Sequence, residues 1–153
     1  MDRADIHLLE ALQRDSTQSI AELAESAALS TSACHRRIRA LEQSGIISGY
    51  GARLDPKRLG LSLVVFVEIT LTSQSHEAMD RFEKAVRDFD DILDCNLMSG
   101  NADYLLRVAA ADLEQFDTIH RECLARLPGV SSMRSSFSIR NIKQWRGYPI
   151  ARG

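Results

Sequence analysis

Apolar residues in the first fifty positions recur with the period of an α-helix. In residues 2–14 they occupy every third position, and one further apolar residue widens the apolar face of the expected helix. They are Ile6, Leu8, Leu9 and Leu12. Because the polar run Asp15–Thr17 follows, the pattern predicts a first helix that ends near Arg14.

Capping residues as well as periodicity predict two further helices. Ser19 and Glu22 form a capping box, since the hydroxyl can accept from the third amide of a helix while the carboxylate reaches back. After a tight turn, Ser30 can cap a third helix, which Gly45 terminates. The expected buried stripes are Ile20, Leu23, Ala24 and Ala27 in the second helix and Cys34, Ile38 and Leu41 in the third.

The pattern changes from helix to strand after Gly45. A connecting strand is predicted over Ile46–Leu54, and turn residues in 55–60 mark a domain boundary. In Leu63–Thr72 the odd positions are all apolar and the even ones only partly so, which predicts a strand with one face in the core. We therefore expect a first domain of residues 1–60 and a second domain of residues 61–153.

Strands and helices alternate in the second domain in an order that repeats one unit. Further strands are predicted at Ile92–Ser99, Asp103–Ala110 and Val130–Ile142. The helices between them carry the apolar stripes Met79, Phe82, Val86 and Phe89, and Leu113, Phe116, Ile119, Cys123 and Leu127. This order predicts an α+β domain of the ferredoxin-like βαββαβ type, with both helices on one face of the sheet.

The other face of that sheet is expected to need a cover. Val64, Phe66, Tyr104 and Leu106 are predicted to lie there, where they would form an apolar patch that monomeric proteins seldom expose. A second copy of the same sheet is the economical cover. The pattern therefore favours a face-to-face homodimer.

Composition indicates a folded protein and leaves its partner open. The chain has 153 residues, of which 44% are hydrophobic and 26% are charged, and its formal net charge is -2. A nucleic-acid function must therefore rest on local clusters of basic residues. The longest apolar run, Leu61–Ile69, is too short for a bilayer and contains Glu68, so we expect no membrane span and a cytoplasmic location.

The stretch from Ser19 to Ser44 has the helix-turn-helix arrangement that sets a recognition helix in the major groove of DNA. The third helix gathers hydroxyl, imidazole and guanidinium groups on the side away from its apolar stripe. We predict DNA contacts from Ser30, Thr31, Ser32, His35, Arg36 and Arg39. Arg37 flanks the stripe and is expected to be structural or to face a phosphate. The alternative is a small helical bundle with a solvated charged face.

The predicted hairpin around Gly100 offers a second candidate site. Glycine permits a backbone conformation closed to other residues, and the exposed amides of a hairpin tip can hold a carboxylate. Asp103 can attract an ammonium group, so together these groups match an α-amino acid zwitterion. The alternative is an ordinary hairpin in which Asp103 bonds its own turn.

Enzymatic and metal-binding functions find little support. The histidines are scattered, and His120 with Cys123 gives only two candidate metal ligands. No nucleophile-elbow, Walker A or dinucleotide-binding motif occurs. Cys34, Cys95 and Cys123 include no C-x-x-C pair and are expected to be reduced thiols. We predict no enzymatic activity, no metal and no cofactor apart from an amino-acid effector.

Several motifs follow one another along nearly the whole chain. The first half carries Leu29-Ser30-x-x-x-Cys34, Arg37-Ile38-x-x-Leu41-Glu42-x-x-Gly45-Ile46-Ile47 and Leu54-Asp55-Pro56. The second half carries Val65-x-Val67, Met98-Ser99-Gly100-x-x-Asp103-Tyr104-Leu105-Leu106, Leu127-Pro128-Gly129-Val130 and Ser135-Ser136-Phe137. In this order they resemble the Lrp/AsnC (leucine-responsive/asparagine-responsive, feast/famine) transcriptional regulators. The sequence departs from the family pattern at Ala28, where a glycine is frequent, and at Thr31 and Ala33, where prolines are frequent.

The resemblance implies a winged helix-turn-helix joined to a RAM or ACT-like regulatory domain, in a regulator of amino-acid metabolism or transport genes. It implies dimers that assemble into tetramers or octamers, with a small amino-acid effector bound where dimers meet. The implied effector contacts are Met98, Gly100, Asn101, Ala102, Asp103 and Tyr104. Two alternatives stay open: a small-molecule-binding ferredoxin-like oligomer, and a DNA-organising protein that needs no effector.

Overall fold

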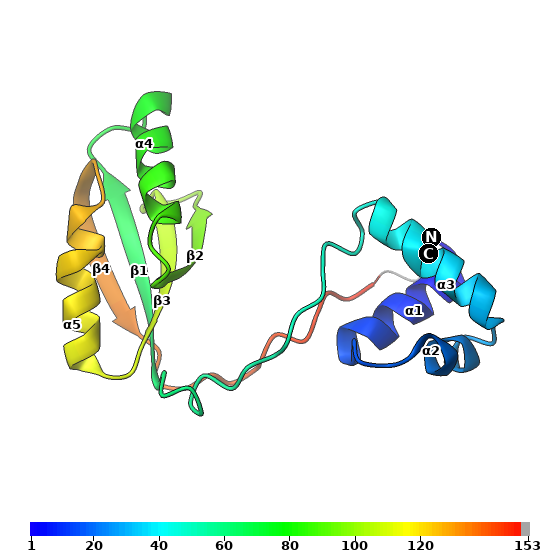
Figure 1. Ribbon diagram of the computed structural model, residues 1–153. Helices are drawn as coiled ribbons and strands as arrows, with labels where there is room; N and C mark the ends of the chain where they lie inside the picture. The colour runs from blue at the N-terminus through cyan, green and yellow to red at the C-terminus, as the bar shows by residue number, and fades with distance from the viewer. Residues whose placement is uncertain (151–153) are drawn as a thin grey trace. The chain divides into compact units, whose positions relative to one another are not determined.

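The computed structural model describes residues 1–150, which divide into two compact units (Figure 1). One unit contains Met1–Arg53 together with the C-terminal segment that begins at Ile142, and the other contains Leu54–Asn141. The boundary expected from the sequence lies between residues 60 and 61 and assigns the C-terminal segment to the second domain. The segment groups with the first unit because Gln13 there holds the backbone of Tyr148 through two hydrogen bonds.

Three helices form the first unit, as predicted. They are α1 (Arg3–Arg14), α2 (Ile20–Ser26) and α3 (Thr31–Gln43). The predicted caps are confirmed, since Ser19 and Glu22 form a capping box at α2 and the Ser30 hydroxyl accepts from the Ala33 amide at α3. Their core consists of Leu8, Ala11, Leu23, Ala24, Cys34 and Ile38.

A residue in the left-handed conformation closes the turn between α2 and α3. Ala28 has a φ of 53°. The amide of Leu29 donates to the carbonyl of Ala24 at 2.9 Å, so α2 ends in a Schellman-type cap. Glycine is favoured at the left-handed position of such a cap because it lacks a Cβ. Ala28 therefore adds backbone strain at the position where the sequence departs from the expected glycine.

The strand predicted over Ile46–Leu54 is not formed. Residues 48–55 have no regular secondary structure. A strand must satisfy its N–H and C=O groups on a neighbouring strand, and no strand within residues 1–150 pairs with this segment. Local β-propensity therefore does not suffice to make it a strand in a single chain.

The second unit is a four-stranded antiparallel sheet with two helices, as predicted (Figure 1). Its elements are β1 (Leu63–Leu71), α4 (His76–Arg87), β2 (Ile92–Leu97), β3 (Tyr104–Ala110), α5 (Leu113–Glu122), the short 3₁₀ helix η1 (Leu124–Arg126) and β4 (Val130–Phe137). The strand order β2-β3-β1-β4 makes β1 and β3 the central strands. Phe82 of α4 and Phe116 of α5 share one core with the odd-numbered residues of β1, so both helices cover the same sheet face.

The register between β1 and β3 corrects the prediction for two residues. Tyr104 lies opposite Ile69 and Leu106 lies opposite Val67, and directly opposed residues share a sheet face. Tyr104 and Leu106 are therefore in the core, 1% and 0% exposed, and not on the open face. Both alternating sets of residues in β3 contain apolar side chains, so periodicity within that strand does not decide which set is buried.

On the open sheet face, Leu105 takes the place predicted for Tyr104 and Leu106, since it lies opposite Glu68 of β1. Val64 and Phe66 lie there as expected, and Phe66 is 39% exposed. Two ion pairs accompany them on this face, Arg134 with Glu68 and Arg107 with Asp94. The face is therefore an apolar centre beside charged pairs.

Two element boundaries also differ from the predictions. β4 ends at Phe137 and does not continue to Ile142, because Phe137 already pairs with Val65 near the beginning of β1. Leu113 was expected in the apolar stripe of α5 but is 65% exposed. It is the first residue of that helix, directly after the N-cap Asp112, where the chain has not yet turned onto the sheet.

Replacing Ala28 with glycine should stabilise the helical unit. The left-handed conformation costs an L-residue about 1–2 kcal/mol, and the greater chain entropy of glycine offsets about half of the gain, so we expect about 0.5–1 kcal/mol. Thermal unfolding followed by circular dichroism measures the change. Ala40→Gly on the exposed side of α3 is the matched control and should destabilise by about 1 kcal/mol. A lower midpoint for Ala28→Gly than for the unchanged protein would contradict the strain.

Candidate DNA-binding and effector sites

All six residues predicted to contact DNA are exposed, with one at the N-cap of α3 and five within the helix. They are Ser30, Thr31, Ser32, His35, Arg36 and Arg39. The opposite side packs into the core through the predicted stripe Cys34, Ile38 and Leu41. The 3.6-residue period thus separates one helix into a packing side and a polar side.

The first residue of the set has a structural role as well. The Ser30 hydroxyl accepts from the Ala33 amide at 3.2 Å and lies 3.2 Å from the hydroxyl of Ser32. It therefore satisfies one of the free amides at the N-terminus of α3. The remaining N-terminal amides and the exposed hydroxyls leave this end of the helix suited to an anion.

The basic residues of the polar side have no partner in the protein. Within residues 1–150, His35, Arg36 and Arg39 make no hydrogen bond or ion pair. Guanidinium groups in this state keep all their donors available for a carboxylate, a phosphate or the O6 and N7 atoms of guanine.

A groove runs along one edge of this polar side. It has a volume of about 440 Å³ and lies between α3 and the residues that join α1 to α2. His35, Arg39, Gln18 and Tyr50 are among its lining residues. The hydroxyl of Tyr50 donates to Glu42 of α3 at 2.8 Å, and burial together with this carboxylate raises the pKa of Tyr50 to about 12. This hydrogen bond attaches Tyr50 to α3 at the groove. We refer to it as the α3 groove.

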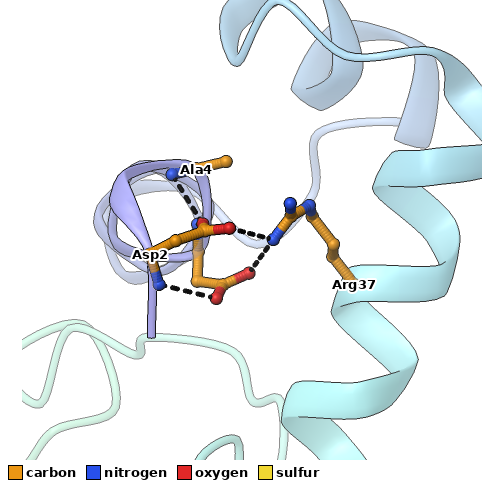
Figure 2. Close-up of polar contacts among 4 residues, drawn as sticks. Asp2, Ala4 and Arg37 are labelled. Atoms are coloured by element: carbon orange, nitrogen blue, oxygen red, sulfur yellow. Dashed lines mark hydrogen bonds and ion pairs between the residues drawn. The ribbon is translucent and has the colours of Figure 1, made fainter.

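Arg37 forms ion pairs within the protein, which agrees with the structural one of its two expected roles. Its guanidinium donates to Asp2 at 2.7 Å and to Asp5 at 2.8 Å, both at the beginning of α1 (Figure 2). The carboxylate of Asp2 also accepts from the amide of Ala4 at 2.9 Å. Backbone hydrogen bonding from Asp5, together with Arg37, lowers the pKa of Asp2. Arg37 thus fixes α3 to α1 and does not extend toward a ligand.

The second candidate site, the loop between β2 and β3, exposes its tip. Met98, Gly100 and Asn101 are exposed and Ala102 is half-buried. The loop is closed by the Met98 amide, which donates to the carbonyl of Asp103 at 2.8 Å. Gly100 does not use the left-handed conformation that a glycine permits, because its φ lies outside that region. The backbone at Gly100 instead borders open space, since no atom lies within 4 Å of the position that a Cβ would take.

Asp103 binds the neighbouring strand and not its own turn. Asp103 is 8% exposed, and its carboxylate accepts from the Leu71 amide and from the Gln74 side chain, each at 2.7 Å. Its own amide donates to the carbonyl of Ile69 at 2.8 Å. These contacts attach the loop to the end of β1. The sequence alone does not point to Gln74, because a single glutamine in a polar loop carries no pattern.

Tyr104 lies beneath the loop in the core. Its ring packs on Phe82 with centroids 4.5 Å apart, and its hydroxyl donates to Glu83 of α4 at 2.9 Å. Burial raises the pKa of Tyr104. The structure therefore divides the six candidate effector residues, with four at or near the surface and Asp103 and Tyr104 supporting them from inside.

The described part of the chain contains no group of three or more histidine, cysteine or acidic side chains placed to hold a metal. Burial raises the pKa of Cys95 and Cys123 to about 11, so neither thiol is a reactive thiolate at neutral pH. Among residues 1–150 no helix has both the length and the apolar character needed to span a membrane.

Two families match the chain, one for each unit. Residues 1–48 match the winged helix-turn-helix DNA-binding family, and residues 64–148 match the Lrp/AsnC ligand binding domain. The leucine-responsive regulatory protein of Escherichia coli K12 is 40% identical over 144 residues, which cover 94% of this chain and 88% of that protein.

Solved structures share the fold over nearly the whole chain. An AsnC family transcriptional regulator from Agrobacterium tumefaciens is 37% identical and has a TM-score of 0.92, covering 97% of each chain. A transcriptional regulator from Neisseria meningitidis, solved as a complex with L-methionine, is 33% identical and also has a TM-score of 0.92. That match covers 97% of this chain and 96% of the Neisseria protein.

Proposed function

The chain belongs to the Lrp/AsnC family of DNA-binding transcriptional regulators, and we propose that it is a sequence-specific regulator of amino-acid metabolism or transport genes that responds to an amino-acid effector. The observation that carries the proposal is the polar side of α3. There His35, Arg36 and Arg39 are exposed on a helix of a helix-turn-helix and have no partner within residues 1–150. The protein is proposed to act in the cytoplasm, as a regulator and not as an enzyme.

In the proposed complex, α3 enters the major groove of duplex DNA with its polar side toward the bases. Ser30, Thr31 and Ser32 lie at the N-terminal end of the helix, where base edges and phosphates are approached in helix-turn-helix complexes. Arg36 and Arg39 supply forked donors for guanine edges or phosphates. The clamp of Arg37 on Asp2 and Asp5 keeps the helix in place without using these donors.

Arg39→Ala should weaken duplex binding. The loss should be about 1–3 kcal/mol if Arg39 reads a base, and the salt slope should flatten by about one unit if it contacts a phosphate. Fluorescence anisotropy across a salt series measures both quantities. Arg81→Ala, on the exposed side of α4 in the other unit, removes the same charge and should leave both unchanged. An Arg39→Ala variant with wild-type affinity and slope would remove Arg39 from the interface.

The effector is proposed to bind at the β2–β3 loop. The exposed backbone at Gly100 and Asn101 offers amides for a carboxylate, and the negative charge of Asp103 lies directly beneath. The Oδ1 atom of Asp103 accepts a hydrogen bond from the Gln74 side chain. The ammonium group of an effector is proposed to replace Gln74 as the donor to this atom. The Neisseria relative solved with L-methionine supports an amino acid as the ligand class.

Calorimetry with the twenty amino acids should find at least one that binds the wild-type protein. Asp103→Asn should abolish that binding while basal DNA affinity persists, because the ammonium loses its counter-charge. Gln74→Ala is the control that removes a partner of Asp103 without changing charge, and it should retain binding. The site would be refuted if none of the twenty amino acids bound the wild-type protein, or if Asp103→Asn bound the ligand as tightly as the wild type.

The protein is proposed to form homodimers that associate into tetramers or octamers. Val64 and Phe66 give the open sheet face an apolar centre, and the charged pairs beside it suit a face-to-face partner with complementary charges. Assembly would complete the effector pocket with a neighbouring dimer. It would also set the spacing of two recognition helices on DNA half-sites.

Phe66→Glu should lower the oligomer mass measured by light scattering. A buried glutamate in an apolar interface must be desolvated without a partner, which opposes association. Leu113→Glu is the matched control, because Leu113 is an exposed apolar residue away from the open face, and it should keep the wild-type mass. A wild-type protein that is monomeric at micromolar concentration would exclude this assembly.

A further inference from the structure

The C-terminal stretch of the sequence carries basic residues and no acidic ones. From Gly129 to Gly153 there is no aspartate or glutamate, whereas the chain as a whole has a net charge of -2. The basic residues of this stretch are Arg134, Arg140, Lys143, Arg146 and Arg152. A local excess of one sign in a chain of balanced charge indicates an anionic partner.

Part of this stretch is fixed on the DNA-binding unit. The side chain of Gln13, near the end of α1, donates to the Tyr148 carbonyl at 3.1 Å and accepts from the Tyr148 amide at 2.6 Å. Gly147 has a φ of 116°, and a Cβ there would lie 2.3 Å from Oε1 of Gln13. The contact therefore requires both the amide of Gln13 and a glycine at residue 147. We call Lys143–Tyr148 the C-terminal strap.

The strap borders a groove that adjoins the α3 groove. This groove has a volume of about 800 Å³, and Trp145, Tyr148, Arg14 and Arg53 are among its lining residues. It shares three lining residues with the α3 groove: Leu12, Ser16 and Tyr50. The strap is thus next to the surface that carries Arg39, within the same unit.

The charges of the strap have no partner in the protein. Lys143 and Arg146 are exposed, and neither makes a hydrogen bond or ion pair among the described residues. Trp145 lies between them in sequence and is 71% exposed. Two unpaired basic groups on a segment without aspartate or glutamate, beside a recognition helix, suit the phosphate backbone of DNA.

We propose that the C-terminal strap is a second DNA contact, in which Lys143 and Arg146 bind phosphates of the duplex that flank the site read by α3. This inference rests on the proposed function. In this proposal the strap raises the affinity for DNA and helps to orient the unit on the duplex. Phosphate contacts carry no sequence information directly, so base selection stays with α3.

The test is the salt dependence of binding to a fluorescent 40-bp duplex of mixed sequence, with the full-length protein. The double variant Lys143→Ala/Arg146→Ala should bind about three- to tenfold more weakly, and its slope of log K against log salt should flatten by about 1.8, that is, about 0.9 for each phosphate contact. Arg81→Ala/Lys84→Ala on α4 removes the same charge from exposed positions of the other unit and should keep the wild-type slope.

A further variant tests the attachment of the strap to Gln13 separately from the charge of the strap. Gly147→Ala keeps every basic residue but places a Cβ against Gln13, so it should release the strap and reduce the salt slope. A Gly147→Ala protein with the wild-type slope would overturn the claim that docking presents the charges. Circular dichroism verifies that each variant is folded.

The outcomes distinguish this inference from the proposed function. If the wild-type protein binds no duplex, both are overturned. If the wild type binds and Arg39→Ala weakens it while the strap double variant keeps the wild-type slope, only the strap contact is overturned. A strap variant that loses DNA affinity together with oligomer mass assigns the charges to contacts between subunits, which also overturns the proposal.

Discussion

The position of α3 depends on contacts that leave its polar side unused. Its apolar stripe is buried against α1 and α2, and Arg37, at the edge of that stripe, binds Asp2 and Asp5. Both kinds of contact lie on the side of the helix that faces the protein. Arg36 and Arg39, on the other side, therefore need not contribute to stability. A helix that carries both a core and a recognition surface must divide them in this way, because a base-reading side chain cannot also be committed to an internal partner.

In the second unit, Asp103 differs from Arg36 and Arg39, because its side chain already has partners within the protein. Its buried carboxylate is committed to the Leu71 amide and to Gln74, so the loop that carries it is attached to the central strand β1. An effector at this loop would therefore compete for an existing partner, and its binding would be linked to the end of β1. Linkage of this kind is what a regulatory site requires, since a ligand shifts an equilibrium only by binding one state better than the other.

The parts of the structure that the sequence predicts are the local ones. One capping box, one N-cap serine and stripes of apolar residues predicted the five α-helices found within residues 1–150, because each signal lies within a few residues of the element it specifies. Tyr104 and Leu106 were placed on the wrong sheet face, because their burial depends on pairing with a strand distant in sequence. The strand expected after α3 lacks a partner, and the hydrogen bonds of Gln13 with Tyr148 join residues 135 positions apart. No pattern within a short window encodes such pairings.

α1 makes structural contacts near both of its ends. Its N-terminal residues Asp2 and Asp5 hold α3 through Arg37. At its other end, Gln13 binds both chain segments that connect this unit to the sheet, since its backbone carbonyl accepts from Arg53 and its side chain pairs with Tyr148. These segments continue into β1 and come from β4, which are paired strands. Within this unit, α1 therefore contacts α3 near one end and both connecting segments near the other.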